Sequence, residues 1–263
     1  MIRALFSAGS GMSAQQTNVD NIAHNLANAN TVGFKMRRAQ FQDLLYQTMV
    51  QPGAAAGAQT TIPSGLQIGL GARTFANEII FTQGSFMQTS NPLDLVIEGR
   101  GFFQVRRPNG EIAYTRSGQF QLNRDGIMVT SEGDPLEPAI TIPPEAQGVS
   151  IAQDGTVSFR QGGQAAAQIA GQIQLANFVN PAGLNNIGRN LYLPTDASGE
   201  PVTGNPGGQE GIGSLMQGYI EQSNVSVVEE FINLIMSQRA YEANSKVVRA
   251  ADEMYQQVNN IAR

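Results

Sequence analysis

The chain has 263 residues, 41% of them apolar, so it can build a substantial core and is globular at least in part. Charged residues make up 14% of the chain against about 25% in an ordinary soluble protein, which predicts a largely neutral polar surface suited to packing against neighbours. The net charge of -5 argues against a nucleic-acid-binding face, and the absence of cysteine excludes disulfides, thiolate zinc sites and cysteine nucleophiles.

The sequence contains no apolar run long enough to predict insertion into a membrane. Its start, Met1 to Gln16, has no continuous apolar block of signal-peptide length. If the protein leaves the cytoplasm, we expect it to do so without a cleaved leader.

The first thirty residues predict one amphipathic helix, because apolar residues recur every seven positions. One row is Leu5, Met12, Val19 and Leu26, and the complementary row is Ala8, Ile22 and Ala29. The pattern stops at Asn30-Thr31-Val32-Gly33, where Gly33 is a plausible helix cap. A second short periodic piece follows at Phe41 and 44–46.

The middle of the chain changes character, because short β-like runs alternate with turn signals. Four turns are predicted, at Pro108-Asn109-Gly110, Asp125-Gly126, Asp154-Gly155 and Gly162-Gly163. Residues 74–200 are therefore predicted to be all-β. Stretches rich in Gly and Pro flank this region at 51–71 and 198–213 and predict linkers or extended arms.

A second long helix is predicted from Ser226 onward, with Ser226 as its cap and Glu229 at the spacing of a capping box. Its apolar seam is predicted to run through Phe231, Leu234, Ile235, Gln238 and Tyr241, and then through Val247, Ala251, Met254, Val258 and Ile261.

The fold class that follows is α+β: terminal helices that pair as a coiled coil, an inserted all-β domain and an extended arm. Residues 1–45 and 214–263 form the helical assembly domain, 46–73 the arm and 74–213 the β-rich outer domain. A helix of ~30 residues is ~45 Å long, so it needs a long partner. That partner is either the other helix, in an ordinary intramolecular hairpin, or neighbouring copies of the chain, and the heptad pattern leaves both open.

Four blocks carry a specific resemblance. They are 26–35 (LANANTVGFK), 91–103 (NPLDLVIEGRGFF) and 218–225 (GYIEQSNV), together with 238–246 (QRAYEANSK). In this order and spread over nearly the whole chain, they resemble the bacterial flagellar rod and hook proteins. The stretch from Asp43 through Pro52-Gly53 to 63–69 (PSGLQIG) is similar to the distal-rod protein of that family.

The resemblance implies a structural subunit of the distal rod, a rigid self-assembling tube that transmits torque across the periplasm to the hook and forms the export channel. It implies copies of the chain, proximal-rod proteins, the hook protein, the ring proteins of the peptidoglycan and outer membrane, and the type III export apparatus as partners. The stretch from Tyr46 to Gly71 would be an arm that reaches neighbouring subunits and stiffens the tube. A proximal-rod or hook-type axial protein is the alternative within the family.

The residues expected at subunit interfaces follow from the helix rows, from the asparagines of the first helix and from the arm. In the helices they are Leu5, Met12, Val19, Ile22, Leu26, Asn25, Asn28, Asn30, Phe231, Leu234, Ile235, Tyr241, Val247, Met254, Val258 and Ile261. In the arm they are Tyr46, Pro52, Gly53, Pro63, Leu66 and Ile68. We favour interhelical amide hydrogen bonds, which fix register, for Asn21, Asn25, Asn28 and Asn30.

Catalysis is the weaker hypothesis. The single histidine, His24, has no triad or metal partners beside it in the sequence. Asp94 with Glu98, or Asp125 with Asp154, could form a glycosidase pair, but carboxylates before glycine are mostly turn residues. No cofactor, metal or enzyme activity is therefore expected. A monomeric binding module built on the β-domain is the remaining alternative.

Overall fold

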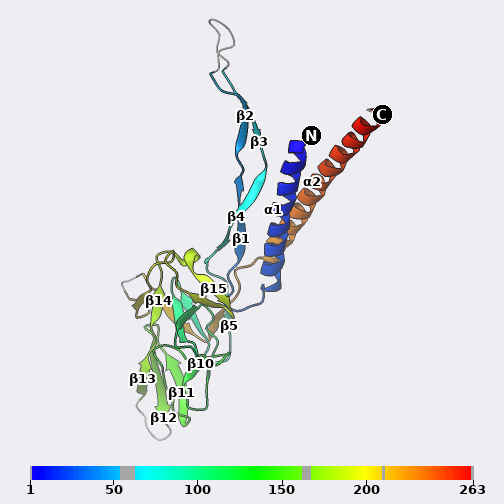
Figure 1. Cartoon of the computed structure of the whole chain (residues 1–263). Helices are drawn as coiled ribbons and strands as arrows, with labels where there is room; N and C mark the ends of the chain where they lie inside the picture. The colour runs from blue at the N-terminus through cyan, green and yellow to red at the C-terminus, as the bar shows by residue number, and fades with distance from the viewer. Residues whose placement is uncertain (1, 54–62, 162–166, 209–210, 262–263) are drawn as a thin grey trace. The chain divides into compact units, whose positions relative to one another are not determined.

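The computed structural model describes residues 2–53, 63–161, 167–208 and 211–261, and it is α+β with a helix at each end and a β-rich middle, as predicted (Figure 1). The chain divides into two compact units. Unit 1 comprises Met1–Ala27, Arg37–Ile79 and Ser226–Arg263. Unit 2 comprises Asn28–Met36 and Ile80–Val225.

Unit 1 contains both helices, α1 (Ile2–Ala27) and α2 (Val227–Ile261). They begin and end close to the predicted positions. A turn follows α1 and includes Gly33, whose φ of +71° is a left-handed conformation that favours glycine. The helices lie side by side and antiparallel, since the end of α1 contacts the start of α2 through Asn25 and Glu230 (Figure 1).

The rest of unit 1 is a long two-stranded antiparallel ribbon. β1 (Arg37–Asp43) pairs with β4 (Ala72–Ile79), and β2 (Tyr46–Val50) continues the ribbon with β3 (Leu66–Gly69). The amide of Leu44 donates to the carbonyl of Gly71 and links the two halves.

The helix-like piece expected at Phe41 and 44–46 is wrong, because this segment belongs to the ribbon. Four apolar residues at helical spacing are a short signal, and strand pairing overrides it by satisfying the backbone hydrogen-bonding groups. In β1 only Ala39 is buried, whereas its neighbours Arg38 and Gln40 are exposed, which is the alternation of a strand.

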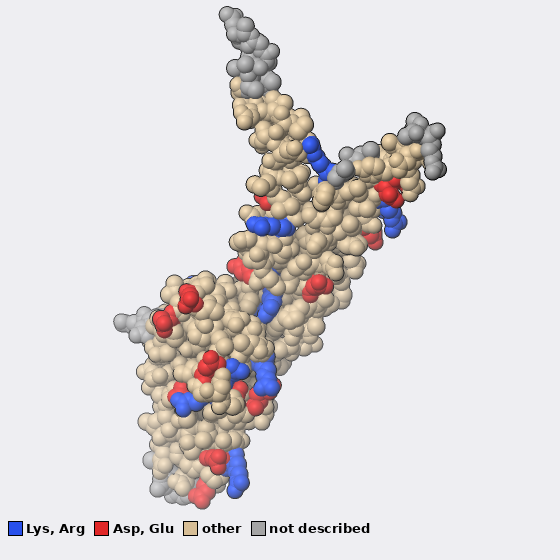
Figure 2. Space-filling view, viewed as in Figure 1, with Lys and Arg blue, Asp and Glu red and all other residues tan. Residues whose placement is uncertain are grey.

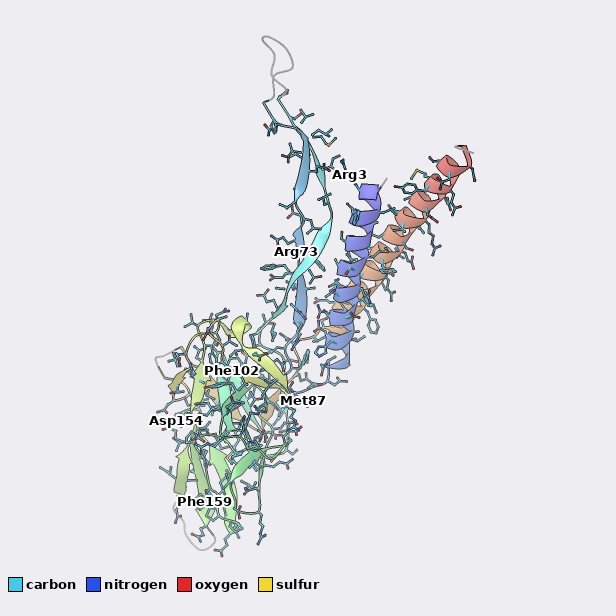
Figure 3. All side chains as sticks on the ribbon, viewed as in Figure 1. Arg3, Arg73, Met87, Phe102, Asp154 and Phe159 are labelled. Atoms are coloured by element: carbon cyan, nitrogen blue, oxygen red, sulfur yellow. The ribbon has the colours of Figure 1, made fainter. Side chains whose placement is uncertain are left out.

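Two side-chain hydrogen bonds anchor the β1–β4 half of the ribbon on α1, whereas the β2–β3 half has one longer contact, from Arg3 Nη1 to Met49 Sδ at 3.9 Å. The amide of Ala72 donates to Ser10 Oγ at 3.3 Å, and Asn77 Nδ2 donates to Asn21 Oδ1 at 2.7 Å. Arg73 joins the strands through Gln42, at 3.1 Å (Figure 3). In β2 and β3 large apolar side chains are exposed, so the far half of the ribbon has no core of its own. They are Tyr46, Met49 and Leu66, with Leu45 just before β2.

Unit 2 is built from antiparallel strands. Its largest sheet has six strands in the order β15-β16-β8-β7-β14-β17, and a three-stranded sheet has the order β11-β12-β13. Three further pairs are β9 with β10, β6 with β18 and β5 with β19. The strands are β5 (Phe86–Gln88), β6 (Leu95–Glu98), β7 (Phe102–Arg106), β8 (Ile112–Thr115), β9 (Phe120–Leu122), β10 (Met128–Thr130), β11 (Ala146–Ile151), β12 (Thr156–Gln161), β13 (Gln168–Gln172), β14 (Leu175–Asn177), β15 (Asn185–Gly188), β16 (Leu191–Leu193), β17 (Val202–Gly204), β18 (Ser214–Gln217) and β19 (Tyr219–Glu221), with a 3₁₀ turn at Pro181–Gly183.

The core of unit 2 lies between these sheets. It joins side chains of β6 and β7, such as Leu95 and Phe103, to Val157 and Phe159 of β12 (Figure 3). Each large apolar side chain buried here contributes about 1.5–3 kcal/mol. A second group of rings contact one another edge to face around Phe102, with centroids 4.8–6.0 Å apart. Unit 2 therefore has a core of its own.

The predicted turns are confirmed where they fall in the described residues. Gly110, Gly126 and Gly155 all have positive φ, as tight turns between strands require. The turn predicted at Gly162-Gly163 lies outside the described residues.

Gly33 is one of the glycines whose replacement we expect to be costly. A Cβ there would lie 2.7 Å from the amide nitrogen of Ser117 and 2.8 Å from the carbonyl carbon of Arg116, and the φ is strained for any other residue. Gly33→Ala should lower the free energy of unfolding of the full chain in urea by more than about 2 kcal/mol. Gly110→Ala, with similar φ but open space around it, should cost only about 1 kcal/mol. Equal losses for both variants would contradict the close-packed position of Gly33.

Candidate functional site

Three segments far apart in the sequence meet inside unit 2, and each belongs largely to one of the blocks that carry the family resemblance; the fourth block, 238–246, lies on α2 in unit 1. The amide of Gly33 donates to the carbonyl of Glu221 at 2.8 Å, and the amide of Gly218 donates to the carbonyl of Asp94 at 2.8 Å. The amide of Met36 donates to Asn224 Oδ1 at 2.7 Å. We call this meeting point the junction; it comprises residues 31–36, 94–101 and 218–224.

The centre of the junction is a buried carboxylate between two buried cations. Glu221 Oε1 lies 2.6 Å from Lys35 Nζ, and Glu221 Oε2 lies 2.8 Å from Arg116 Nε. Glu221 is 1% exposed and Lys35 is 2% exposed. The amide of Gly84 donates a further hydrogen bond to Oε1 at 2.9 Å. Breaking a buried, hydrogen-bonded ion cluster of this kind is costly, because it leaves an uncompensated charge.

Backbone carbonyls take up the remaining donors of the two cations. Arg116 donates from Nη1 to the carbonyl of Gly101 and from Nη2 to those of Gly99 and Ile97. Gly99 and Gly101 have φ of +105° and +133°, which only glycine adopts easily. Gly99 and Gly101 therefore let the turn before β7 face the guanidinium.

The charges at the junction set its ionisation. Burial opposes ionisation of Glu221, but the charges of Arg116 and Lys35 and the bonds from Lys35 and Gly84 outweigh it, so the pKa of Glu221 lies below its ordinary value. Burial lowers the pKa of Lys35 and the charge of Arg116 adds to this, although Glu221 acts in the opposite direction. Glu221 is therefore ionised at neutral pH.

In unit 1 the predicted interface residues fall into two groups. Leu5, Met12, Val19 and Leu26 of α1 are partly buried, and Ile22 and Asn25 are buried within the unit. On α2, Leu234 is partly buried, but the other large apolar residues of the predicted seam are exposed. These are Phe231, Ile235, Tyr241, Val247, Met254 and Val258. Ile261 belongs to α2, but its side chain lies outside the described part.

The remaining predicted residues lie in the turn after α1 and in the arm. Thr31 Oγ1 donates to Asn28 Oδ1 at 3.1 Å, whereas Asn30 is exposed. Tyr46, Leu66, Pro52, Gly53 and Pro63 are exposed, and Ile68 is half-buried. Residues 54–62 of the arm lie outside the described residues.

Sequence reasoning named Asn25 but missed the other residues that form side-chain hydrogen bonds between α1 and α2. Asn18 Nδ2 donates to Ser237 Oγ at 2.8 Å, and Asn25 Nδ2 donates to Glu230 Oε2 at 3.2 Å. Asn25 also bonds the backbone of Arg37. The preference for amide bonds along α1 pointed toward this pairing, but it did not include Asn18 or its partners on α2.

Of the carboxylates weighed for catalysis, Asp94 and Glu98 do not form a pair. Asp94 and Glu98 are four residues apart across strand β6, roughly 13 Å along an extended backbone, which exceeds the spacing used by glycosidases. Asp154 binds the backbone and hydroxyl of Thr156, as a turn residue does, and these bonds lower its pKa. His24 is exposed on α1.

The surface gives little sign of a ligand site. On the face drawn in Figure 2, Lys and Arg side chains lie singly and form no basic stripe. Within the described residues, no three His, Asp or Glu side chains gather as metal ligands, and no helix is long and apolar enough to span a membrane. The features that stand out are the junction and the helix pair, which are elements of a structural subunit.

Comparison with known proteins also indicates a structural subunit. Three family models match: "Flagella basal body rod protein" over residues 5–35, "Flagellar hook protein FlgE/F/G D1 domain" over 96–159 and "Flagellar basal body rod FlgEFG protein C-terminal" over 216–261. The flagellar basal-body rod protein FlgG of Buchnera aphidicola (subsp. Schizaphis graminum) is 48% identical over 99% of this chain and 100% of its own length. FlgG of Caulobacter vibrioides is 47% identical over 99% of each chain, and FlgG of Bacillus subtilis is 39% identical over 100% of each.

The chain belongs to the flagellar basal-body rod protein family, a family of structural proteins, and is a rod subunit of the FlgG type. The resemblance to the distal-rod protein is thereby confirmed. Membership in this family implies polymerisation with copies of the chain and assembly into the flagellar basal body.

Glu221→Gln tests the junction. Removing one partner of a buried ion cluster should lower the free energy of unfolding by about 3–5 kcal/mol at pH 7. Because the folded pKa of Glu221 lies below the unfolded value of 4.5, this contribution is present above that pH and is lost as the pH falls through the folded pKa. The difference between the variant and the parent should therefore shrink below about pH 4. Urea unfolding across pH measures both.

Glu111→Gln is the matched control, since Glu111 pairs with Arg107 at the surface at 3.1 Å. It should cost at most about 1 kcal/mol at every pH. A Glu221→Gln loss as small as the control's would show that the buried cluster does not hold the junction together.

Proposed function

We propose that this chain is a subunit of the distal rod, which it builds as a rigid tube by repeated contacts between the terminal helices of neighbouring copies. The tube would carry torque across the periplasm to the hook and enclose the export channel. The observation that supports this proposal best is the exposed apolar surface of α2.

Five large apolar side chains lie exposed within nine residues near the start of α2. They are Val228, Phe231, Ile232, Ile235 and Met236, between 47% and 69% exposed. A helix in a monomeric protein normally turns such residues to a core. Burying the exposed part of each would contribute about 1 kcal/mol or more, so one contact along this face would add several kcal/mol. In a family of rod subunits, we expect another copy of the chain to bury this face of α2.

The helices support a coiled-coil pairing as part of the proposal. On α2 the residues buried or half-buried in unit 1 alternate at steps of three and four, as heptad positions do. They include Glu230, Leu234, Ser237, Asn244, Val248, Ala251 and Tyr255. The apolar residues that lie outside this row then remain for contacts between subunits, together with the partly exposed Leu5, Met12, Val19 and Leu26 of α1.

The ribbon supports the proposed arm. Its far half has exposed Leu45, Tyr46, Met49 and Leu66 and no apolar partner of its own among the described residues. A two-stranded ribbon is marginal in water unless another surface covers it. We therefore propose that Tyr46 to Gly71 lies on neighbouring subunits and limits bending of the tube.

The comparisons favour the distal over the proximal position within the rod. The flagellar basal-body rod protein FlgF of Caulobacter vibrioides is 36% identical over 93% of this chain, whereas the FlgG proteins reach 39–48% over nearly all of it. Partners at the two ends would be proximal-rod and hook proteins, with ring proteins around the tube and delivery by the type III export apparatus. A monomeric β-domain module is disfavoured by the exposed face of α2, which such a module would not need.

A double substitution tests the exposed face. Phe231→Gln with Ile235→Gln should leave the unfolding free energy of the dilute monomer within about 1 kcal/mol of the parent, because both side chains are already exposed. Assembly, measured as rod completion and swimming in a strain lacking the native gene, should be lost. Val179→Gln with Val202→Gln, exposed on unit 2, should preserve swimming. Normal swimming of the α2 variant would refute the proposed interface.

Shortening the ribbon tests the arm. Removing residues 46–69 leaves the paired β1 and β4 and both helices intact, so the chain should fold and assemble. The assembled rods should bend more, as measured by the curvature of isolated basal bodies in electron micrographs. A full-length variant with Leu45, Tyr46, Met49 and Leu66 changed to Ser separates loss of contact from loss of length. If both variants formed straight rods, the proposal that the arm limits bending of the tube would be wrong.

A further inference from the structure

The surface between α1 and α2 carries polar and small residues where a helix pair normally has large apolar ones. Asn25 meets Glu230 at 3.2 Å and Asn18 meets Ser237 at 2.8 Å. At Gly11 an added Cβ would lie 2.9 Å from Asn244 Nδ2, so the amide of Asn244 occupies the space that the glycine leaves. We call these three pairs the register row.

The three pairs of the register row are evenly spaced along both helices. Each step of seven residues forward along α1, from Gly11 to Asn18 to Asn25, is matched by seven residues backward along α2, from Asn244 to Ser237 to Glu230. Seven residues are two turns of a supercoiled helix, so the pairs stack along a single line of contact.

A slip of one heptad would break this complementarity in either direction. If Gly11 moved opposite Ser237, Asn244 would lose the space at Gly11 and Asn25 would pass beyond the start of α2. If Asn18 moved opposite Asn244, two amide side chains would compete for one layer, and Glu230 would pass beyond the end of α1. Asn25 is 1% exposed and Glu230 is 4% exposed, so either slip leaves a buried polar group without its hydrogen-bond partner. Leucine layers would impose no such penalty.

We propose that the register row consists of positioning residues that select one axial offset between α1 and α2. A buried polar residue at a core position is the device by which coiled coils fix register, at some cost in stability. The register row does not depend on the proposed function, because all its contacts lie within one chain. It also sets how far α2 projects: with Ile2 as the first residue of α1, Met254–Ile261 extend past it.

Engineered disulfides measure the offset directly, since the chain has no cysteine to interfere. Gly11→Cys with Asn244→Cys reports the observed register, because the Gly11 Cβ position lies 3.5 Å from Asn244 Cγ, within reach of a disulfide. Gly11→Cys with Ser237→Cys reports a slip of one heptad. In the dilute full-length monomer under mild oxidation, the first pair should cross-link at least about tenfold faster than the second.

Two leucine variants then separate the register row from general helix stability. Asn18→Leu with Glu230→Leu brings its leucines together only in the slipped register, so the ratio of the two cross-linking rates should fall at least about tenfold. Asn18→Leu with Ser237→Leu brings them together in the observed register, and its 11–244 cross-link should form as fast as in the parent. Ser13→Leu with Asn233→Leu changes exposed positions and should alter neither rate.

An unchanged ratio in Asn18→Leu with Glu230→Leu would overturn the proposal. If that variant loses helix content by circular dichroism, Asn18→Ala with Glu230→Ala takes its place, and its rate ratio should fall about threefold or more as both hydrogen bonds are lost. No fall in that variant would equally overturn the proposal. Both measurements use monomer, so their outcomes do not depend on those of the assembly tests.

Discussion

In unit 2, one carboxylate serves two buried cations. Glu221 neutralises only one of the two charges on Lys35 and Arg116, so the cluster keeps an excess positive charge out of water. Such a cluster persists only where other acceptors surround it. The carbonyls of Ile97, Gly99, Gly101 and Thr82 provide them, and each is held by a strand or turn of the β-unit. The segment 31–36, the turn before β7 and the strand β19 are therefore mutually dependent: none can be placed without the other two.

The two units use polar groups in opposite ways. At the junction, charges are buried at a point where three segments must converge, and the apolar cores of β6, β7 and β12 surround it. Between the helices, the amides of Asn18 and Asn25 meet the hydroxyl of Ser237 and the carboxylate of Glu230, and many large apolar side chains of α2 are exposed. Unit 2 thus has a core of its own, whereas much of the apolar surface of unit 1 is exposed and, under the proposed assembly, would be covered by other copies. Eight acidic and eight basic residues leave unit 1 with no net charge, and the whole excess of -5 belongs to unit 2. Copies of unit 1 can approach one another without net repulsion.

Heptad spacing was enough to predict both helices, and glycine turn signals were enough to predict the β character of the middle. What periodicity could not predict is the inner face of the helix pair. Apolar rows such as Leu5 to Leu26 are expected inside, but the contact runs one position away, through Gly11, Asn18 and Asn25, because small and polar residues let the helices approach closely. The ribbon around Phe41 was missed because strand pairing with β4, some thirty residues later, decides it. Lys35, Arg116 and Glu221 are ordinary charged residues in the sequence, and only the long-range pairing of β5 with β19 and of β7 with β8 brings them together.

The register row has a consequence for how the length of such a chain can change. Inserting or deleting one residue in α1 rotates everything beyond it by about 100° and removes the later pairs from the line of contact. A change in one helix is tolerated only in blocks of seven, and each block shifts the offset unless the other helix changes with it. The ribbon is under no such restriction, because adding one residue to each strand lengthens it by about 3.3 Å and leaves every existing pair in place. Between the helices and the ribbon, we therefore expect changes in length to be tolerated in the arm, where reach can be adjusted without disturbing the helices.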